Sequence, residues 1–206
     1  MWKLDELLRF LEAGGRLPGK PWYQVVAAPG TQLIMAFTGH TVIVTDLGEE
    51  WVAARLPHED LSAPLCPPFL SAMEAATGKR VNNIDILTMA PPEPGEPDVE
   101  LSVIEDSDHP RVRRAHRYRT DVTVYRAEGA VLIVGRGVGG RWEAAVEVDE
   151  GARGRGLGRV LAQAARRLVP EQRPIWAQIA PGNAASVRAF LAAGYVPVGA
   201  EALLVA

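Results

Sequence analysis

Residues 146–159 read Val-Glu-Val-Asp-Glu-Gly-Ala-Arg-Gly-Arg-Gly-Leu-Gly-Arg, and this stretch decides the fold of the second half of the chain. It runs from an apolar strand through a glycine-rich loop into an amphipathic helix predicted over 156–169. Gly154, Gly156 and Gly158 let backbone N–H groups approach a ligand closely. The helix N-terminus stabilises a pyrophosphate, and the neighbouring arginines add charge-assisted hydrogen bonds. Taken alone, the loop is equally consistent with a glycine-rich turn carrying solvated arginines.

A second glycine cluster, Gly135-Arg-Gly137-Val-Gly139-Gly140, matches the dinucleotide pattern GxGxxG. That pattern binds a pyrophosphate only where a strand ends and a helix begins. Here the residues that follow, 141–148, are typical of a strand. We therefore interpret the cluster as a hairpin loop, and a nicotinamide-dependent redox enzyme would require a helix after it.

The surrounding pattern predicts an α/β protein with a mixed sheet. In the second half we expect strands at 99–105, 122–125, 131–135, 142–148 and 174–179, helices at 110–119 and 184–193, and two closing strands at 195–198 and 202–205. In the first half we expect a helix ending at Gly14-Gly15, strands at 23–28, 31–38, 41–46 and 84–89, a helical turn at 49–56 and a helix at 67–78, with a two-residue turn at Gly39-His40. The proline-rich residues 91–97 forbid regular structure. We therefore predict an α/β domain over 1–90, a linker over 91–97 and a second domain over 98–206.

Composition and charge limit the function classes. Residues 1–100 hold 7 Lys/Arg and 14 Asp/Glu, whereas residues 101–206 hold 15 Arg and 11 Asp/Glu, so a polyanionic ligand is expected on the second half. The excess is too small to indicate nucleic acid. With Cys66 alone there is no internal disulfide, and neither a signal peptide nor a membrane span is predicted, so we expect a cytoplasmic protein. The histidines lack ligand spacing, which predicts no metal site.

Two linked motifs resemble the GNAT superfamily of N-acetyltransferases over residues 99–206. Arg-x-x-Gly-x-Gly at 153–158 resembles that superfamily's R/Q-x-x-G-x-G/A signature, and the segment from Asn183 and Ser186 to Gly194-Tyr195 resembles its later helix-turn-strand. The resemblance implies a central splayed mixed β-sheet flanked by helices. Residues 1–90 carry no recognised motif. They could form a degenerate GNAT-like unit, a dimerisation module or a substrate-selecting module.

The resemblance implies acetyl-CoA as the co-substrate. Its pantetheine would bond the backbone of Val146, Glu147 and Val148 as an added strand. Its pyrophosphate would lie on the amides of Arg153, Gly154, Arg155, Gly156, Leu157, Gly158 and Arg159. Asn183 would contact the pantetheine arm or cap its helix, with Ser186 nearby.

The implied activity is direct transfer of acetyl to a primary amine, in a small molecule, peptide or protein, within a ternary complex. Glu143 and Glu147 share one strand face, and either could act as the base, directly or through water. Many members carry a tyrosine acid where this chain has Phe190, so Ser186 is the candidate acid and Tyr195 a weaker one. The alternative is a catalytically inactive acyl-CoA-binding regulatory module.

The densest basic stretch is 111–119, Arg-Val-Arg-Arg-Ala-His-Arg-Tyr-Arg. By the resemblance it borders the acceptor cleft, where it could recognise an acidic substrate or the 3′-phosphate of the cofactor, with His116 and Tyr118 as further site residues. A solvated helix face is the alternative interpretation.

Overall fold

The computed structural model describes residues 2–105 and 108–206 of the chain. It divides into two compact units. Unit 1 comprises Met1–Leu87 with Val198–Ala206, and unit 2 comprises Thr88–Pro197. This division differs at both ends from the predicted 1–90, 91–97 and 98–206, because the last residues of the chain pair with a strand of unit 1. Among the described residues, no helix is both long and apolar enough to span a bilayer.

Unit 1 is a sheet with helices against it. Its elements are α1 (Leu4–Glu12), β1 (Tyr23–Val26), β2 (Gln32–Phe37), β3 (His40–Val44), α2 (Glu49–Ala53), the 3-10 turn η1 (Ala63–Leu65), α3 (Pro67–Thr77) and parts of β4 (Arg80–Ala90) and β10 (Val196–Val205). The strand order is β1-β3-β2-β10-β4. Side chains of α2 and α3 pack on β2, β3 and β10, with Met73, Phe69 and Ile43 fully or almost fully buried.

Two details of unit 1 differ from the sequence prediction. The β2–β3 turn is Thr38-Gly39, one residue earlier than expected, with Gly39 at φ +75°. The two closing strands are one strand, β10, because Gly199–Leu204 pair continuously with Gln32–Phe37 of β2. A Cβ at Gly199 would lie 2.2 Å from the Ala36 carbonyl oxygen, so glycine permits this close approach.

Unit 2 contains the glycine-rich stretch in a mixed sheet. Its elements are the end of β4, β5 (Ser102–Ile104), α4 (Pro110–Tyr118), β6 (Thr120–Ala127), β7 (Ala130–Arg136), η2 (Val138–Gly140), β8 (Trp142–Val148), η3 (Glu150–Ala152), α5 (Leu157–Leu168), η4 (Pro170–Gln172), β9 (Ile175–Ile179), α6 (Ala184–Ala192) and the start of β10. The order is β4-β9-β8-β7-β6-β5. Strands β5 to β8 form an antiparallel meander, and β8 pairs with β9 in parallel.

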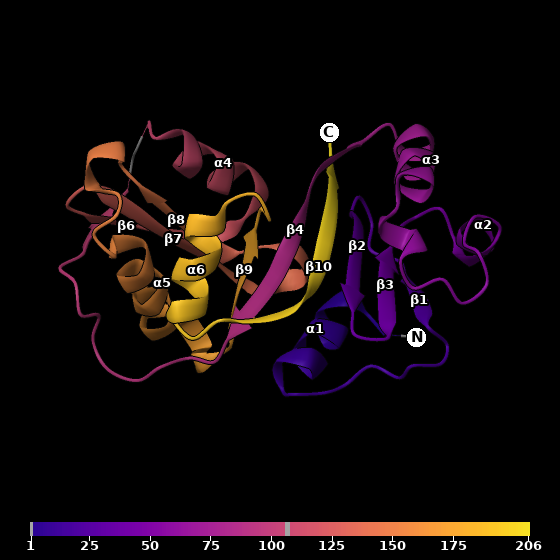
Figure 1. Ribbon diagram of the computed structural model, residues 1–206, viewed down its shortest axis with the longest axis horizontal. Helices are drawn as coiled ribbons and strands as arrows, with labels where there is room; N and C mark the ends of the chain where they lie inside the picture. Colours follow the sequence, from indigo (N-terminus) through magenta and orange to yellow (C-terminus); the bar gives the residue numbers. More distant parts are fainter. Residues whose placement is uncertain (1, 106–107) are drawn as a thin grey trace. The chain divides into compact units, whose positions relative to one another are not determined.

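Helices cover both faces of this sheet (Figure 1). On one face, α5 and α6 pack on Trp142 and Ala144 of β8. On the other, Val112 and Ala115 of α4 pack with Ile133 and the half-buried Ala145. Successive β8 side chains thus alternate between an α5–α6 core and an α4 core, as the two-residue period of a strand requires. The α/β mixed-sheet fold class predicted from the sequence is confirmed.

The sheet opens between β8 and β9. On its β7 side, β8 is paired along its whole length, from Trp142 with Arg136 to Val148 with Ala130. On its β9 side, pairing covers only Trp142 and Glu143. The last five residues of β8 therefore present an edge of backbone groups that is not paired with β9.

The proline-rich segment is irregular, as predicted, but it is bound to unit 2 rather than free. Glu93 N–H donates to the Arg166 carbonyl at 3.0 Å, and Arg166 Nε returns a bond to the Pro91 carbonyl at 3.0 Å. Arg166 also donates to the Ala193 carbonyl at 2.9 Å. The Arg166 side chain therefore ties both the segment and the end of α6 to α5.

Candidate functional site

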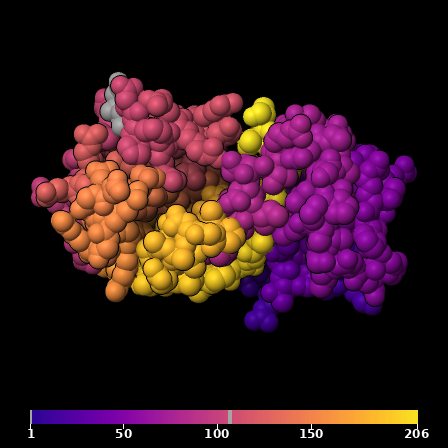
Figure 2. Space-filling model, turned by 45° about the horizontal axis from the view of Figure 1, so that its top comes forward, coloured from indigo at the N-terminus to yellow at the C-terminus, as the bar shows by residue number. Residues whose placement is uncertain are grey.

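A cavity of about 600 Å³ lies in unit 2 at the open edge of β8. Its lining comes from the ends of β8 and α4, the glycine loop, the start of α5 and one face of α6. The lining residues are Arg111, Val146, Glu147, Val148, Ala152, Arg153, Gly154, Gly156, Leu157, Gly158, Arg159, Asn183, Ala185, Ser186, Arg188, Ala189, Phe190 and Ala192. In Figure 2 the surface of unit 2 is hollowed where the orange atoms of the loop region and the yellow atoms of α6 meet the rose-coloured atoms above them.

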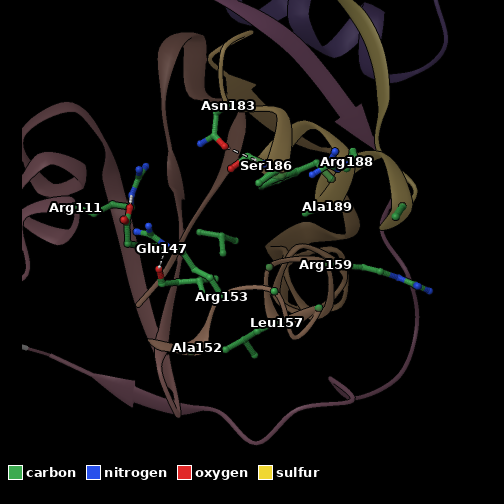
Figure 3. A pocket seen from close by; sticks show the side chains of 18 residues that line it. Arg111, Glu147, Ala152, Arg153, Leu157, Arg159, Asn183, Ser186, Arg188 and Ala189 are labelled. Carbon is green, nitrogen blue, oxygen red and sulfur yellow. Dashed lines mark hydrogen bonds and ion pairs between the residues drawn. The ribbon is translucent and has the colours of Figure 1, made fainter. Parts of the chain in front are cut away.

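The structure brings together most of the residues that the sequence selected. Every predicted cofactor-binding residue lines the cavity except Arg155, which is exposed outside it. Of the three predicted catalytic residues, Glu147 and Ser186 line the cavity and Glu143 does not. Figure 3 shows Glu147 on β8 and Ser186 on α6 among the labelled side chains.

The loop before α5 presents backbone donors to the cavity. Within residues 2–105 and 108–206, no hydrogen bond takes the N–H of Gly154, Arg155, Gly156, Leu157 or Gly158. Gly154 and Gly156 have φ of +78° and +81°, and a Cβ at either position would meet no atom within 4 Å. Glycine is therefore required there by backbone conformation, while the space beside it stays open. Amides at a helix N-terminus that face open space form an anion-binding site.

The arginines that line the cavity differ in where their side chains lie. Arg153 Nε donates to the Val148 carbonyl at 3.2 Å, which folds its side chain back against the end of β8. Arg159 lies on α5, and Figure 3 shows its side chain reaching away from Arg111 and Glu147. Arg188, on α6, also lines the cavity. The sequence analysis did not select Arg188, although it shares the α6 face of Ala185, Ala189 and Ala192 at helical spacing, which is the signal that could have found it.

Asn183 begins α6 as its N-cap. Its side-chain oxygen accepts from Ser186 N–H at 3.1 Å, so the capping role anticipated for this residue is present. This bond satisfies one N–H of the first helical turn and fixes Ser186 at the rim of the cavity (Figure 3). The alanine face of α6 behind it leaves room in the cavity.

Glu147 is joined to the basic helix. Arg111 Nε donates to Glu147 Oε2 at 2.6 Å, with the two side chains 41% and 33% exposed. Both residues line the cavity, and they come from different elements, α4 and β8 (Figure 3). A carboxylate therefore faces the cavity at the open edge of the sheet, with a guanidinium beside it.

Glu143 occupies a different environment on the same strand face. Arg119 Nε donates to its Oε2 at 2.8 Å, and Arg141 Nε and Gln178 Nε2 each donate to its Oε1 at 2.8 Å. Burial raises the pKa of Glu143, but the charges of Arg141 and Arg119 outweigh burial and lower this pKa to about 2. A carboxylate bonded to three donors and outside the cavity is a poor base, so the expectation that it shares this role with Glu147 is not supported by its position.

Phe190 and Tyr195 lie deep in the α5–α6 core. Their rings meet edge to face with centroids 4.8 Å apart, and both residues are at most 5% exposed. Phe190 lines the cavity but carries no proton to donate. The Tyr195 hydroxyl is buried without a hydrogen-bond partner among the described residues, and burial raises its pKa well above the usual range. Neither ring supplies an acid to the cavity.

The GxGxxG cluster is a hairpin loop, as predicted. It comprises the end of β7, the short turn η2 and the start of β8, and no α-helix follows it. A Cβ at Gly137 would lie 2.2 Å from the Glu143 carboxylate. Gly137 therefore makes room for the buried glutamate. The condition for a nicotinamide site is therefore absent from this segment.

The basic helix α4 divides its charges between two directions. Arg111 and the following Arg119 turn inward to Glu147 and Glu143. Arg114 and Arg117 each lie 5.2 Å from the exposed ring of Tyr118, and His116 is exposed. His116 and Tyr118 do not line the cavity. In the part of the chain that the structure describes, no three His, Cys, Asp or Glu side chains gather as metal ligands would.

One family model matches this part of the chain, and several solved structures are similar to the chain. Residues 95–195 match the family model described as "Acetyltransferase (GNAT) family". Solved structures similar to the chain include a GCN5-related N-acetyltransferase from Kribbella flavida, with 20% identity, TM-score 0.43, and coverage of 66% of this chain and 63% of that one. Another is a putative acetyltransferase from the GNAT family of Novosphingobium aromaticivorans DSM 12444, with 19% identity, TM-score 0.44, and coverage of 62% and 67%.

A GCN5-related N-acetyltransferase from Sphaerobacter thermophilus is also similar, with 13% identity, TM-score 0.38, and coverage of 65% and 54%. The chain thus spans less than two thirds of the first and third of these structures. No curated protein matches it. The family match includes β8, the glycine loop, α5 and α6, which build the cavity. Residues 95–195 of this chain therefore belong to the acetyltransferase (GNAT) family.

Proposed function

We propose that unit 2 binds acetyl-CoA in the cavity at the open edge of β8 and transfers the acetyl group to a primary amine. Family membership implies acetyl transfer. The observation that carries the proposal is the continuity between two groups of backbone atoms, the β8 edge that is not paired with β9 and the glycine-loop amides that have no acceptor in the described part of the chain. One extended ligand with an amide-containing arm and a pyrophosphate has groups for both.

The residues present fit that ligand. The N–H groups of 154–158 with the α5 N-terminus supply donors for a pyrophosphate, and Arg159 and Arg188 add positive charge beside the cavity. Arg155 is exposed and does not line the cavity. The backbone of Val146, Glu147 and Val148 offers an extended arm the hydrogen bonds of an added strand. When bound, the acetyl-CoA supplies an activated thioester.

Residues at the cavity carry out the proton transfers and stabilise the negative charge that develops during the reaction. Glu147 accepts the proton that the acceptor's ammonium loses, directly or through water. A backbone N–H near Val148 donates to the carbonyl oxygen as negative charge develops on it. Ser186 donates its hydroxyl proton to the leaving thiolate. In the transfer the amine nitrogen forms a bond to the acetyl carbon while the carbon–sulfur bond breaks, with both substrates bound together. The second proton that the nitrogen loses restores the Ser186 hydroxyl.

Calorimetric titration with acetyl-CoA, followed by CoA release over a panel of amines, tests this proposal. We expect saturable binding and turnover with at least one amine. Glu147→Gln and Ser186→Ala should keep binding and lose most turnover. The Ser62→Ala variant, in unit 1, is the control for Ser186→Ala. If the purified protein gave neither heat nor a thermal shift with acetyl-CoA, the proposal would be lost.

A second candidate function is an acyl-CoA-binding regulatory module without turnover. Phe190 favours it, because the ring that lines the cavity has no proton to donate. The same titration would then show binding, while no amine of the panel released CoA. Robust turnover that Ser186→Ala abolishes would eliminate this candidate.

We also keep three expectations as proposals. The single cysteine suits a reducing compartment such as the cytoplasm. Unit 1 could serve as a dimerisation or substrate-selecting module. The acceptor is expected to be a small molecule, a peptide or a protein, and neither nucleic acid nor membrane is expected as a partner.

A further inference from the structure

We infer that the acceptor is a zwitterion, with a free carboxylate next to its amine as in an α-amino acid, and that Arg111 selects it. The inference rests on the proposed function and names the substrate class of the same cavity. Its basis is the pair formed by Arg111 of α4 and Glu147 of β8, which both line that cavity.

The pair uses only part of each side chain. Arg111 bonds Glu147 through Nε, to the single oxygen Oε2, at 2.6 Å. Within residues 2–105 and 108–206, neither Nη of Arg111 nor Oε1 of Glu147 has a hydrogen-bond partner. The guanidinium therefore retains two parallel Nη–H donors, and the carboxylate retains one acceptor oxygen. The two charges lie side by side at the cavity, each partly exposed.

This arrangement complements a ligand that carries both charges close together. A carboxylate binds the Nη edge of an arginine with good geometry, and an ammonium binds a carboxylate oxygen. An α-amino acid therefore meets both groups while the Arg111–Glu147 bond stays intact. A simple amine can bind only the free Glu147 oxygen and leaves the Nη donors of Arg111 without an anion.

Seating the carboxylate also positions the amine for reaction. With its carboxylate held on Arg111, the nitrogen lies beside Glu147 Oε1, the atom proposed to accept its proton. Proton transfer requires contact at hydrogen-bond distance, so a correctly oriented acceptor gains in turnover as well as in affinity. Arg111 is thus a specificity-determining residue that touches the acceptor.

Matched acceptors test the inference directly. The panel contains the L-amino acids, their α-carboxamides, the corresponding decarboxylated amines and a dipeptide amide, with kcat/KM measured by CoA release. We expect the best amino acid to exceed its carboxamide by about tenfold or more, as loss of one charge-assisted contact implies. In Arg111→Gln this preference should fall to within about threefold, and Arg111→Lys should retain an intermediate preference because it keeps the charge without the fork.

Arg113→Gln is the matched control. Arg113 lies on the exposed side of the same helix, pairs with Asp108, and does not line the cavity. This variant should keep the wild-type ratio of amino acid to carboxamide. Circular dichroism of each variant identifies any that fails to fold, and Arg111→Lys then carries the test.

The outcomes separate the two proposals. Absence of acetyl-CoA binding in the calorimeter overturns the proposed function and the inference with it. Binding with turnover of carboxamides or simple amines at least as fast as amino acids overturns only the inference. Binding without turnover of any acceptor overturns the inference and favours the regulatory module. If the preference for amino acids persists in Arg111→Gln, Arg111 does not recognise the carboxylate, and the inference is overturned.

Discussion

Two glycine-rich loops of unit 2 look alike in sequence but differ in purpose. In the loop at 135–140, the position of a Gly137 Cβ is already filled by the Glu143 carboxylate, 2.2 Å away. In the loop at 154–158, Cβ positions at Gly154 and Gly156 face open space, and the nearby N–H groups have no acceptor in the described chain. Glycine serves internal packing in the first loop and the approach of a ligand in the second.

The comparison shows how a glycine loop that can bind a ligand is distinguished from a glycine-rich hairpin of similar sequence. Both loops follow a strand, but only the second begins an α-helix, whose N-terminus adds a partial positive charge. The first has a buried anion of its own, Glu143, held by two arginines and a glutamine. A loop that already encloses a carboxylate leaves no space for a phosphate.

The largest expected effect comes from removing that enclosed carboxylate. Glu143→Ala should destabilise unit 2 by about 3–5 kcal/mol, because Arg141, fully buried, and Arg119 lose the anion that both bond. Urea unfolding monitored by tryptophan fluorescence measures this loss. Asp121→Ala, which removes an exposed partner of Arg136, is the control and should cost under about 1 kcal/mol. An equal cost for the two variants would contradict a central role for Glu143.

Acid should weaken the same region. The pKa of Glu143 is lowered to about 2 in the folded chain from an ordinary value of 4.5, so below pH 4.5 the unfolded chain binds the proton more readily. The stabilisation is complete above pH 4.5 and is lost as the pH falls towards 2, on the order of 3 kcal/mol in total. Unfolding free energies measured from pH 6 to pH 2 should show this decline. In Glu143→Gln the unfolding free energy should decline less over this pH range. An unchanged decline in that variant would show that Glu143 does not cause it.

Gly137→Ala should cost roughly 1–3 kcal/mol, because its new methyl group collides with the Glu143 carboxylate. Thermal unfolding measures the cost. The double variant Gly137→Ala with Glu143→Ala should lose less stability than the sum of the two single changes, since the colliding group is gone. Simple additivity would show that Gly137 is needed for another reason.

Gly156→Ala is expected to give the smallest change in stability and a larger one in binding. Its φ of +81° costs an alanine about 1 kcal/mol, although no atom lies in the way. Because the strained loop amides would shift, acetyl-CoA affinity should fall about tenfold by calorimetry. Gly151→Ala is the matched control, because Gly151 has no positive φ, its Cβ would meet nothing within 4 Å and it does not line the cavity, so the affinity should stay within about threefold. Equal losses in both variants would argue against a special conformation at Gly156.

Much of the fold could be predicted from the sequence because it depends on local patterns of apolar residues and glycines. Strand β8 has the predicted bounds, Trp142–Val148, and α5 and α6 match within about a residue of the prediction, since apolar period and flanking glycines define them. The single strand β10 was missed because Gly199 interrupts its apolar pattern. Its continuity depends on pairing with β2, a strand some 160 residues earlier.

The sequence by itself determined the glycine loop that begins α5, because positive φ and a helix start are short-range properties of Gly154, Gly156 and the residues around them. It also selected both glutamates of β8, which period two places on one face. Only the tertiary structure decided which groups surround each of these two glutamates. Glu143 meets donors from positions 119, 141 and 178, while Glu147 meets Arg111 at the cavity. The environment of a charge depends on residues distant in sequence, which no local pattern around either glutamate encodes.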